Sequence, residues 1–241
     1  KTGPFVKWAG GKKQLLDKLE ARMPAAYERY YEPFIGGGAL LLDLQPEKAV
    51  INDTNEQLLN VYRQLKIDVE AVIAAVNELD ALPCDKERYL STREVYNAKI
   101  QAHELDPECA ALMIWINKHC FNGLYRVNAK GLFNVPYNNK VGGVSIDAEN
   151  LRNIGRYLRT NEVEIRQGDF EIACFDAHPG DFVYFDSPYV PIDATANFTD
   201  YTKEGFSLED HKRLAALYRR LSEQGVKVML SNHDVPLVHE L

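Results

Sequence analysis

The sequence predicts an α/β fold of the doubly wound type, in which helices cover a largely parallel sheet. Five short segments are rich in Val, Ile, Phe and Tyr, as buried strands are. Other segments show the apolar spacing of amphipathic helices. The stretch between the second and third strand segments, residues 54–161, is almost wholly helical. The fold is therefore expected to carry a helical insertion within its sheet.

The elements follow from their periodicity and their bounding residues. We expect strands at 30–34, 48–53, 162–166, 182–186 and 227–231, and helices at 12–22, 38–44, 55–80, 87–102, 107–120, 147–159 and 207–224. The last helix is the best delimited, because Ser207 suits an N-cap, Asp210 follows three residues later and Gly225 lies just beyond its end. Residues 125–137 alternate around Ala129-Lys130-Gly131, which predicts a β-hairpin.

Composition excludes several classes of protein. The 241 residues are 46% hydrophobic and 26% charged, which is ordinary for a soluble protein. There is no apolar run near membrane-spanning length and no secretory signal, so we expect a cytoplasmic protein without a membrane partner. The four cysteines form no Cys-x-x-Cys pair and the six histidines have no metal spacing. We expect neither disulfides nor a metal site.

The charge is unevenly distributed. The formal net charge is −7, yet residues 1–16 and 115–146 contain no Asp or Glu. The basic residues of these segments are Lys1, Lys7, Lys12, Lys13, Lys118, Arg126, Lys130 and Lys140. Two interpretations are open: a side that faces a polyanion, or solvated charge that acids from elsewhere in the chain approach in space.

Three glycines, Gly36, Gly37 and Gly38, separate a predicted strand from a predicted helix. Glycine in this place permits positive φ and close approach of a ligand to a helix amino terminus. A dinucleotide fingerprint would need a further glycine where Leu41 stands, which disfavours a nucleotide-dependent oxidoreductase. "WAGGKK" is not a phosphate-binding P-loop, because Lys13 replaces the required Ser or Thr.

Acids stand at two further strand ends. Asp53 could accept from both hydroxyls of a ribose; alternatively, Asp53 or Asn52 caps the helix that follows, and the two roles are compatible. Asp169 could accept from an amino group and Phe170 could cover a flat ring, although "QGDF" also fits a simple turn. The carboxyl ends of parallel strands meet at one edge of a sheet, so these side chains predict a nucleoside-binding edge.

The stretch Asp186-Ser187-Pro188-Tyr189 ends the fourth predicted strand. An amine on an aromatic ring, such as that of adenine, is a poor nucleophile because its lone pair is delocalised. The Asp186 carboxylate and the Ser187 carbonyl could both accept from such an amine and localise that lone pair. Pro188 would stiffen the loop and Tyr189 would stack on the base. The alternative is an Asx turn with an exposed Tyr.

A base within a duplex could reach such a pocket only after being flipped out, so a DNA-gripping surface is required. The basic hairpin region is the candidate: Arg126 could pair with a guanine edge, and Asn122, Lys130 and Asn134 could hold phosphates or bases. Phe121 could wedge into the base stack. For Phe121 and Leu124 the alternative is packing within the hairpin.

Six ordered motifs together resemble the Dam family of DNA adenine-N6 methyltransferases: "PFVKWAGGKKQLL", "YYEPFIGGGAL", "VINDTNEQLL", "NGLYRVNAKGLFNVPY", "GDF" and "FVYFDSPY" with "FTDYTKEGFS". Their order resembles that of the alpha group of amino-methyltransferases. The resemblance implies a Rossmann-like S-adenosylmethionine-dependent methyltransferase domain, residues 1–56 and 161–241, with an inserted helical DNA-recognition domain, residues 57–160, that carries the hairpin 125–137.

The resemblance also implies roles for individual residues. It implies S-adenosylmethionine contacts at Trp8, Lys12, Phe34, Ile35, Gly36, Gly37, Gly38, Asp53, Asp169, Phe170 and Asp186. It implies that Asp186, the Ser187 carbonyl and Tyr189 hold a flipped adenine, and that Lys7, Asn122, Leu124, Arg126, Asn134 and Pro136 face double-stranded DNA. The family's usual site is GATC, and some members work beside a cognate restriction endonuclease.

This chain departs from the family pattern in three places. Ser187 stands where family members usually have Pro, and residues 138–142 replace a usual Gly-Arg-Tyr continuation. Family members also usually extend beyond the point matching Leu241. A catalytically silent, DNA-binding homologue therefore stays open as an alternative. An N4-cytosine methyltransferase is the nearest chemical alternative, although such enzymes more often place Ser at the position of Asp186.

Overall fold

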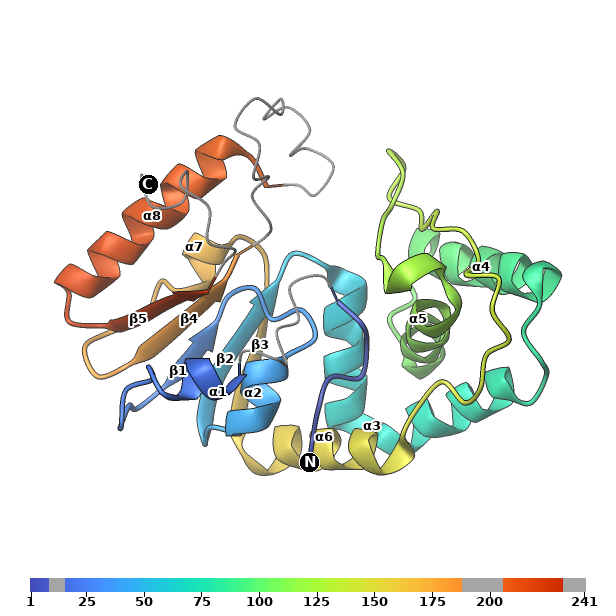
Figure 1. Ribbon diagram of the computed structural model, residues 1–241, viewed down its shortest axis with the longest axis horizontal. Coiled ribbons are helices and arrows are strands. Elements are labelled where there is room, and N and C mark those ends of the chain that lie inside the picture. The colour runs from blue at the N-terminus through green and yellow to red at the C-terminus, as the bar shows by residue number, and fades with distance from the viewer. Residues whose placement is uncertain (9–15, 188–205, 232–241) are drawn as a thin grey trace.

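The computed structural model describes residues 1–8, 16–187 and 206–231, and its centre is a parallel sheet (Figure 1). The strands are β1 (Tyr30–Glu32), β2 (Lys48–Asp53), β3 (Glu162–Gln167), β4 (Phe182–Asp186) and β5 (Lys227–Ser231). They lie in the order β3-β2-β1-β4-β5, and every neighbouring pair is parallel. The chain leaves β1 in one direction and returns on its other side at β4, so the strand order reverses there. In parallel sheets such a reversal opens a crevice at the carboxyl edge.

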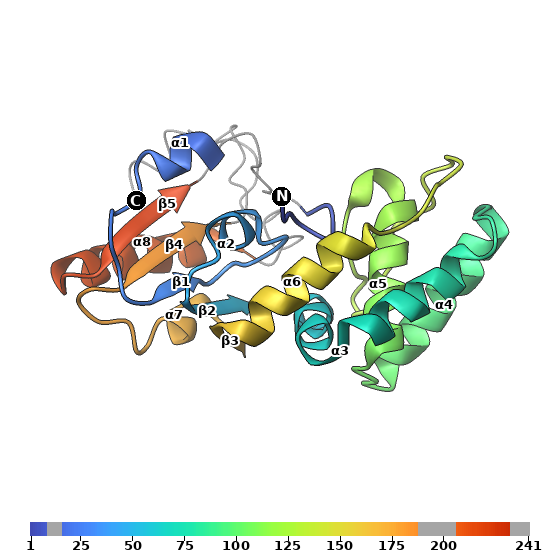
Figure 2. The ribbon, with the colours of Figure 1, turned by 90° about the horizontal axis from the view of Figure 1, so that it is seen from below.

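Alternate side chains of the central strands enter two separate cores. Tyr30 belongs to one hydrophobic cluster and Tyr31 to the other, as expected from the two-residue period of a strand. The first core is covered by α2 (Ala39–Leu44), α3 (Glu56–Asp80) and α6 (Ala148–Thr160), and the second by α7 (Phe170–Ala173) and α8 (Leu208–Glu223). The parallel α/β architecture expected from the sequence is confirmed (Figure 2).

The long helices agree with the sequence prediction to within one residue at either end. Besides α3, α6 and α8 these are α4 (Lys86–Gln101) and α5 (Pro107–His119). Each begins after a residue whose side chain accepts a backbone N–H of the first turn: Asn55, Asp85, Asp106, Asp147 and Ser207. At α8 the expected capping box is confirmed, because Ser207 and Asp210 bond each other's backbone N–H.

Short elements differ from the prediction. β1 ends at Glu32 instead of residue 34, because Pro33 has no N–H to offer the ladder. α1 (Leu16–Glu20) is shorter than the expected 12–22, of which residues 12–15 lie outside the described part of the chain. α7 and the 3₁₀ turn η2 (Phe121–Gly123) were not predicted, since so few residues show no periodicity.

The predicted hairpin at 125–137 is only partly right. Its turn forms around Gly131, whose φ is +80° and whose N–H donates to the Asn128 carbonyl at 2.9 Å. Its arms are joined by one isolated antiparallel bridge, between Val127 and Phe133, and form no ladder. Two backbone bonds flank this bridge, from the Asn128 N–H to the Leu132 carbonyl at 2.8 Å and from the Asn134 N–H to the Arg126 carbonyl at 3.2 Å. The backbone of Phe133 faces away from the other arm, where the Asn97 amide of α4 accepts from its N–H at 2.8 Å and donates to its carbonyl at 2.9 Å.

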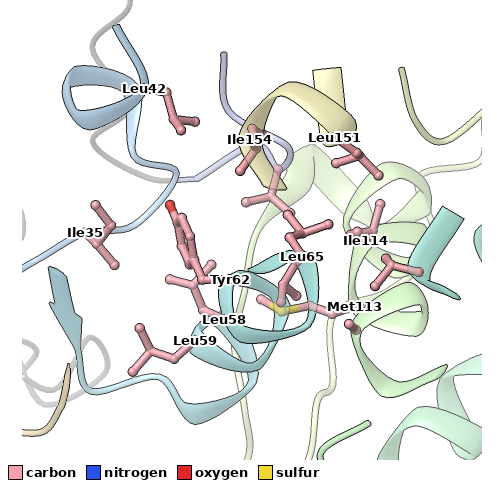
Figure 3. Close-up of a cluster of buried hydrophobic side chains, with 14 of the residues drawn as sticks. Ile35, Leu42, Leu58, Leu59, Tyr62, Leu65, Met113, Ile114, Leu151 and Ile154 are labelled. Carbon is pink, nitrogen blue, oxygen red and sulfur yellow. The ribbon is translucent and has the colours of Figure 1, made fainter. Parts of the chain in front are cut away.

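Helix α3 joins the sheet to the inserted helices through one continuous core. Figure 3 shows Ile35 and Leu42 on one side of α3, and Met113 and Ile114 of α5 on the other. Tyr62 points away from α3, and its hydroxyl donates to the Gly36 carbonyl of the loop Gly36–Gly38, called the glycine loop below. The inserted helices therefore share a core with one face of the sheet. Within the described residues, no helix combines the length and apolar character needed to cross a bilayer.

Candidate functional site

A single cleft at the carboxyl edge of the sheet gathers most of the residues that the sequence singled out. They are Lys7, Trp8, Phe34, Ile35, Gly36, Gly37, Gly38, Asp53, Asn122, Leu124, Arg126, Asp169, Phe170, Asp186 and Ser187. Phe121, Asn134 and Pro136 are not among its lining residues. Lys12, Pro188 and Tyr189 lie outside the described residues, so their expected roles stay predictions.

The glycine loop owes its composition to its neighbours. Gly36 and Gly38 have φ of +48° and +72°, which side chains rarely adopt. A Cβ at Gly36 would lie 2.8 Å from Trp8 Cδ1, and one at Gly38 would lie 2.5 Å from the Tyr62 hydroxyl oxygen. That hydroxyl donates to the Gly36 carbonyl at 2.9 Å. The backbone of the loop is thus held against the cleft with no side chain in between.

Asp53 braces the same loop. Its Oδ2 accepts from the Gly36 N–H at 3.2 Å and its Oδ1 from the Asn55 N–H at 3.1 Å. Burial raises the pKa of Asp53, and these backbone donors oppose that rise. Asn55, whose side chain accepts from the Leu58 N–H, is the N-cap of α3, so the alternative that Asn52 or Asp53 caps this helix is wrong.

Asn52, which sequence reasoning missed as a site residue, ties strand ends together. Its buried amide donates to the Pro33 carbonyl at 3.0 Å and to the Gly168 carbonyl at 2.9 Å. The loops that follow β1 and β3 are therefore both attached to the end of β2. A polar residue in an otherwise apolar strand end was the only signal in the sequence.

Asp169 is the N-cap of α7, where its Oδ2 accepts from the Glu171 N–H at 3.0 Å. The turn interpretation of "QGDF" is therefore correct, and it coexists with a place in the cleft. Asp169 also forms a bidentate ion pair with Arg213, a cleft residue that sequence reasoning missed. This pair lowers the pKa of Asp169. Phe170 is buried, with its ring 5.3 Å from that of Phe34 between centroids.

Asp186 is the last residue of β4 and lies beside Glu32, a buried acid that sequence reasoning also missed. The Tyr30 hydroxyl donates to Glu32 Oε1. Burial raises the pKa of Glu32 to about 8, and the negative charges of Asp186 and Asp53 add to that rise. The signal was present, because Glu32 directly precedes the Pro-Phe-Ile-Gly turn at the end of a strand.

The side of the cleft opposite the sheet comes from the amino-terminal segment and from η2. The Asn117 side chain joins the two: its Oδ1 accepts from the Lys7 N–H at 2.8 Å, and its Nδ2 donates to the Lys7 carbonyl at 2.8 Å and to the Gly123 carbonyl at 3.3 Å. Phe121 and Leu124 are 48% and 43% exposed. Neither side chain is fully packed within the hairpin, and about half of each is available at the surface.

The basic side chains that the structure describes in the two acid-free segments mostly form no ion pair with a described acid. Among the described residues no carboxylate forms an ion pair with Lys7, Arg126 or Lys130, whereas Lys1 pairs with Asp43 at 2.9 Å. Arg126 instead donates through Nε to Asn134 Oδ1 at 2.9 Å. This hydrogen bond leaves both terminal NH₂ groups of the guanidinium available. The distribution favours the interpretation that this side faces a polyanion.

One group of possible metal ligands lies away from the cleft, formed by Glu28, His178 and Asp181. Its central carboxylate has a structural role: Asp181 Oδ1 accepts from the Arg29 N–H at 3.1 Å and Oδ2 from the His178 N–H at 3.0 Å. These bonds fix the turn before β4. We assign no ion to this group.

A parallel α/β sheet with a glycine loop and acids at the ends of four strands is typical of α/β enzymes that bind a nucleoside at the carboxyl edge. Comparison with known proteins identifies the family. The model of the D12 class N6 adenine-specific DNA methyltransferases matches residues 8–241. The chain belongs to this family, whose members methylate adenine in DNA.

Curated relatives agree with this assignment. The chain is 46% identical to the Type II methyltransferase M1.LlaDCHI of Lactococcus lactis subsp. cremoris, over 99% of the chain and 84% of that protein. It is 41% identical to the Type II methyltransferase M.MjaIII of Methanocaldococcus jannaschii, over 95% and 83%. It is 34% identical to the DNA adenine methylase of Escherichia coli K12, over 100% and 84%.

Proposed function

We propose that the protein transfers a methyl group from S-adenosylmethionine to the 6-amino group of an adenine flipped out of duplex DNA, at GATC or a related site. The observation that carries the proposal is the composition of the cleft. One wall holds the glycine loop and the acids at four strand ends, and the other holds Lys7 and Arg126, which have no acidic partner among the described residues.

The cleft suits the cofactor that the family implies. S-adenosylmethionine carries positive charge on its sulfonium and ammonium groups, and the acids Asp53 and Asp186 line the cleft. We propose that the cofactor is held by Trp8, Lys12, the loop from Phe34 to Gly38, Asp53, Asp169, Phe170 and Asp186. When bound, it would supply an electrophilic methyl group.

The proposed catalytic work falls to the end of β4. Asp186 and the Ser187 carbonyl would accept from the amine of the target adenine, which localises its lone pair for attack. Pro188 would brace this loop and Tyr189 would stack on the base. Stabilisation of this kind depends on fixed orientation, and Asp186 is paired with Ser231 of β5 at the end of the sheet, which makes it a suitable place.

The recognition surface is proposed to be the inserted domain, residues 57–160, together with Lys7. Arg126, oriented by Asn134, would contact a guanine edge, and Phe121 would enter the base stack. Asn122, Leu124, Lys130 and Pro136 would contact the backbone or neighbouring bases. The exposure of Phe121 and Leu124 supports this proposal, because apolar side chains that meet bases must be free at the surface.

Further proposals concern a partner protein and two alternative functions. A cognate restriction endonuclease is a proposed partner, on the ground that two relatives are named Type II methyltransferases. Ser187 favours the alternative of a silent DNA-binding homologue, since it replaces the proline usual in the family. Asp186 favours adenine over the N4-cytosine alternative.

The test is transfer of tritiated methyl from S-adenosylmethionine to duplex DNA, followed by nucleoside analysis. The label should appear in N6-methyladenine. Asp186→Ala should lower turnover at least about 100-fold while DNA affinity changes little, because the lost acceptor acts on the reacting amine. Glu223→Gln, at the exposed end of α8, is the control that should keep full activity. Label in cytosine, or cofactor binding without label in any base, would refute the proposal.

A further inference from the structure

Arg213, on the second turn of α8, is held by acids from two helix starts. Its terminal nitrogens lie 2.8 Å and 3.1 Å from the two oxygens of Asp169, 3.1 Å from Glu171 Oε1 and 3.0 Å from Asp210 Oδ1. Asp169 and Glu171 belong to the start of α7, and Asp210 belongs to the capping box of α8. The guanidinium therefore joins the amino-terminal ends of the two helices that cover the second core.

The same guanidinium forms part of the cleft wall. It lies over the Phe170 ring, 4.7 Å from the ring centroid, while other parts of that ring pack against Phe34 and Phe206. Phe170 is 4% exposed, whereas the side chains of Arg213 and Asp169 are each 35% exposed and line the cleft. A flat ligand at this end of the cleft would meet the Arg213–Asp169 pair.

The pair determines what Asp169 can recognise. A bidentate guanidinium fixes the plane of a carboxylate and keeps it ionised. Asp169 Oδ2 already accepts from Arg213 and from the Glu171 N–H, whereas Oδ1 accepts only from Arg213 and retains capacity for a further hydrogen bond. An ionised carboxylate only accepts. It is therefore complementary to an exocyclic amine and repels a carbonyl oxygen in the same place.

We propose that Arg213 is a positioning residue that orients Asp169 toward the base of the nucleoside cofactor and makes the cleft select a 6-amino purine over a 6-oxo purine. This inference rests on the proposed function, because it takes the cleft to bind S-adenosylmethionine. Arg213 acts through Asp169 and contributes no atom to methyl transfer.

The test compares the binding of S-adenosylhomocysteine and of its deaminated, 6-oxo counterpart by titration calorimetry, without DNA. The wild-type protein should bind the amino compound at least about tenfold more tightly. The 6-oxo compound lacks the exocyclic amine, so the acceptor oxygen of Asp169 would be left without its donor. Arg213→Gln should weaken S-adenosylhomocysteine about tenfold and remove most of the preference. Arg213→Lys, which keeps the charge but loses the fork, should fall between the two.

Lys212→Gln is the matched control, because it removes the same charge from the same helix at an exposed position. It should leave both affinities unchanged. If Arg213→Gln keeps the full affinity and the full preference, the inference is overturned. Equal losses of affinity for both compounds would also overturn it, because a general disturbance of the cleft would cause them. If Arg213→Gln does not fold, Arg213→Lys is the deciding variant. A preference of Arg213→Lys for the amino compound equal to that of the wild type would overturn the inference. Failure of the wild-type protein to bind either compound would instead refute the proposed function.

Discussion

Glu32 is an acid that is buried in the wall of the cleft. It is 3% exposed, accepts from the Tyr30 hydroxyl and lies near the negative charges of Asp53 and Asp186. Its pKa of about 8 means that the acid is protonated in the folded protein at neutral pH. A neutral acid at this depth avoids a third negative charge beside Asp53 and Asp186.

This raised pKa predicts a pH-dependent stability. The unfolded value for Glu is about 4.3, so the folded state binds one more proton between about pH 4 and 8. The stabilisation linked to that proton is complete below pH 4 and is lost as pH rises toward 8, by up to about 1.4 kcal/mol per pH unit. Glu32→Gln, which cannot ionise, should therefore gain stability relative to the wild type as pH rises from 5 to 8.

Urea denaturation of both proteins at several pH values measures this difference, in which the titration of all other groups cancels. Glu162→Gln, at an exposed strand start, should keep a constant difference from the wild type. A constant difference for Glu32→Gln as well would show that Glu32 is ionised in the folded protein.

At the scale of elements, α8 carries Arg213 into the cleft, and its position depends on the capping box. Ser207 accepts from the Asp210 N–H at 3.1 Å, and Asp210 accepts from the Ser207 N–H at 3.0 Å and from Arg213 at 3.0 Å. The start of the helix and the orientation of Arg213 are therefore coupled through Asp210.

Ser207→Ala should lower the free energy of unfolding by about 1 kcal/mol, the usual loss for an N-cap serine. Ser222→Ala, near the exposed end of the same helix, should be neutral or slightly stabilising because Ala has the higher helix propensity. Urea denaturation of the two variants checks this; equal effects would mean that the cap contributes nothing.

At the scale of the whole molecule, α3 and α6 pack closely against each other where they cover one face of the sheet. The two helices approach at Gly155, where an added Cβ would lie 2.6 Å from the Leu65 carbonyl oxygen and 3.2 Å from Val69 Cβ. Leu65 and Val69 lie on either side of Asp68, where α3 leaves helical geometry with φ of −155°. A larger residue at 155 has to move one helix away from the other.

Gly155→Ala should therefore destabilise the protein by about 1–3 kcal/mol, as overpacking does in tight cores. In an exposed helix the same change would stabilise by up to about 1 kcal/mol, so the sign of the effect tests the packing. Thermal and urea denaturation measure it, and a gain in stability would contradict the close approach.

Residues whose role depends on position along a strand were predictable from the sequence. Asp53 and Asp186 end predicted strands and Asp169 follows one by a short turn, and parallel strands bring their carboxyl ends to one edge. Arg213 was not predictable, because its partner Asp169 lies 44 residues away and a helical arginine is usually solvated. Asn52 was missed for the same reason, since it bonds Gly168 across 116 residues.

The hairpin shows the limit of local patterns. Alternation around Gly131 correctly predicted a turn, yet the arms keep only the two backbone bonds that flank the Val127–Phe133 bridge. The outward-facing backbone of Phe133 is bonded by Asn97, 36 residues earlier in the chain, and local periodicity cannot register such a contact from another helix.

The sequence by itself determined the α/β class, the five strands, the long helices with their caps and the acids at the strand ends, because these depend on spacing and on neighbours within a turn. Only the tertiary structure decided the protonation of Glu32, the pairing of Arg213 with Asp169 and the exposure of Phe121 and Leu124. Each of these depends on burial or on contacts between segments far apart in the chain, which no local pattern records.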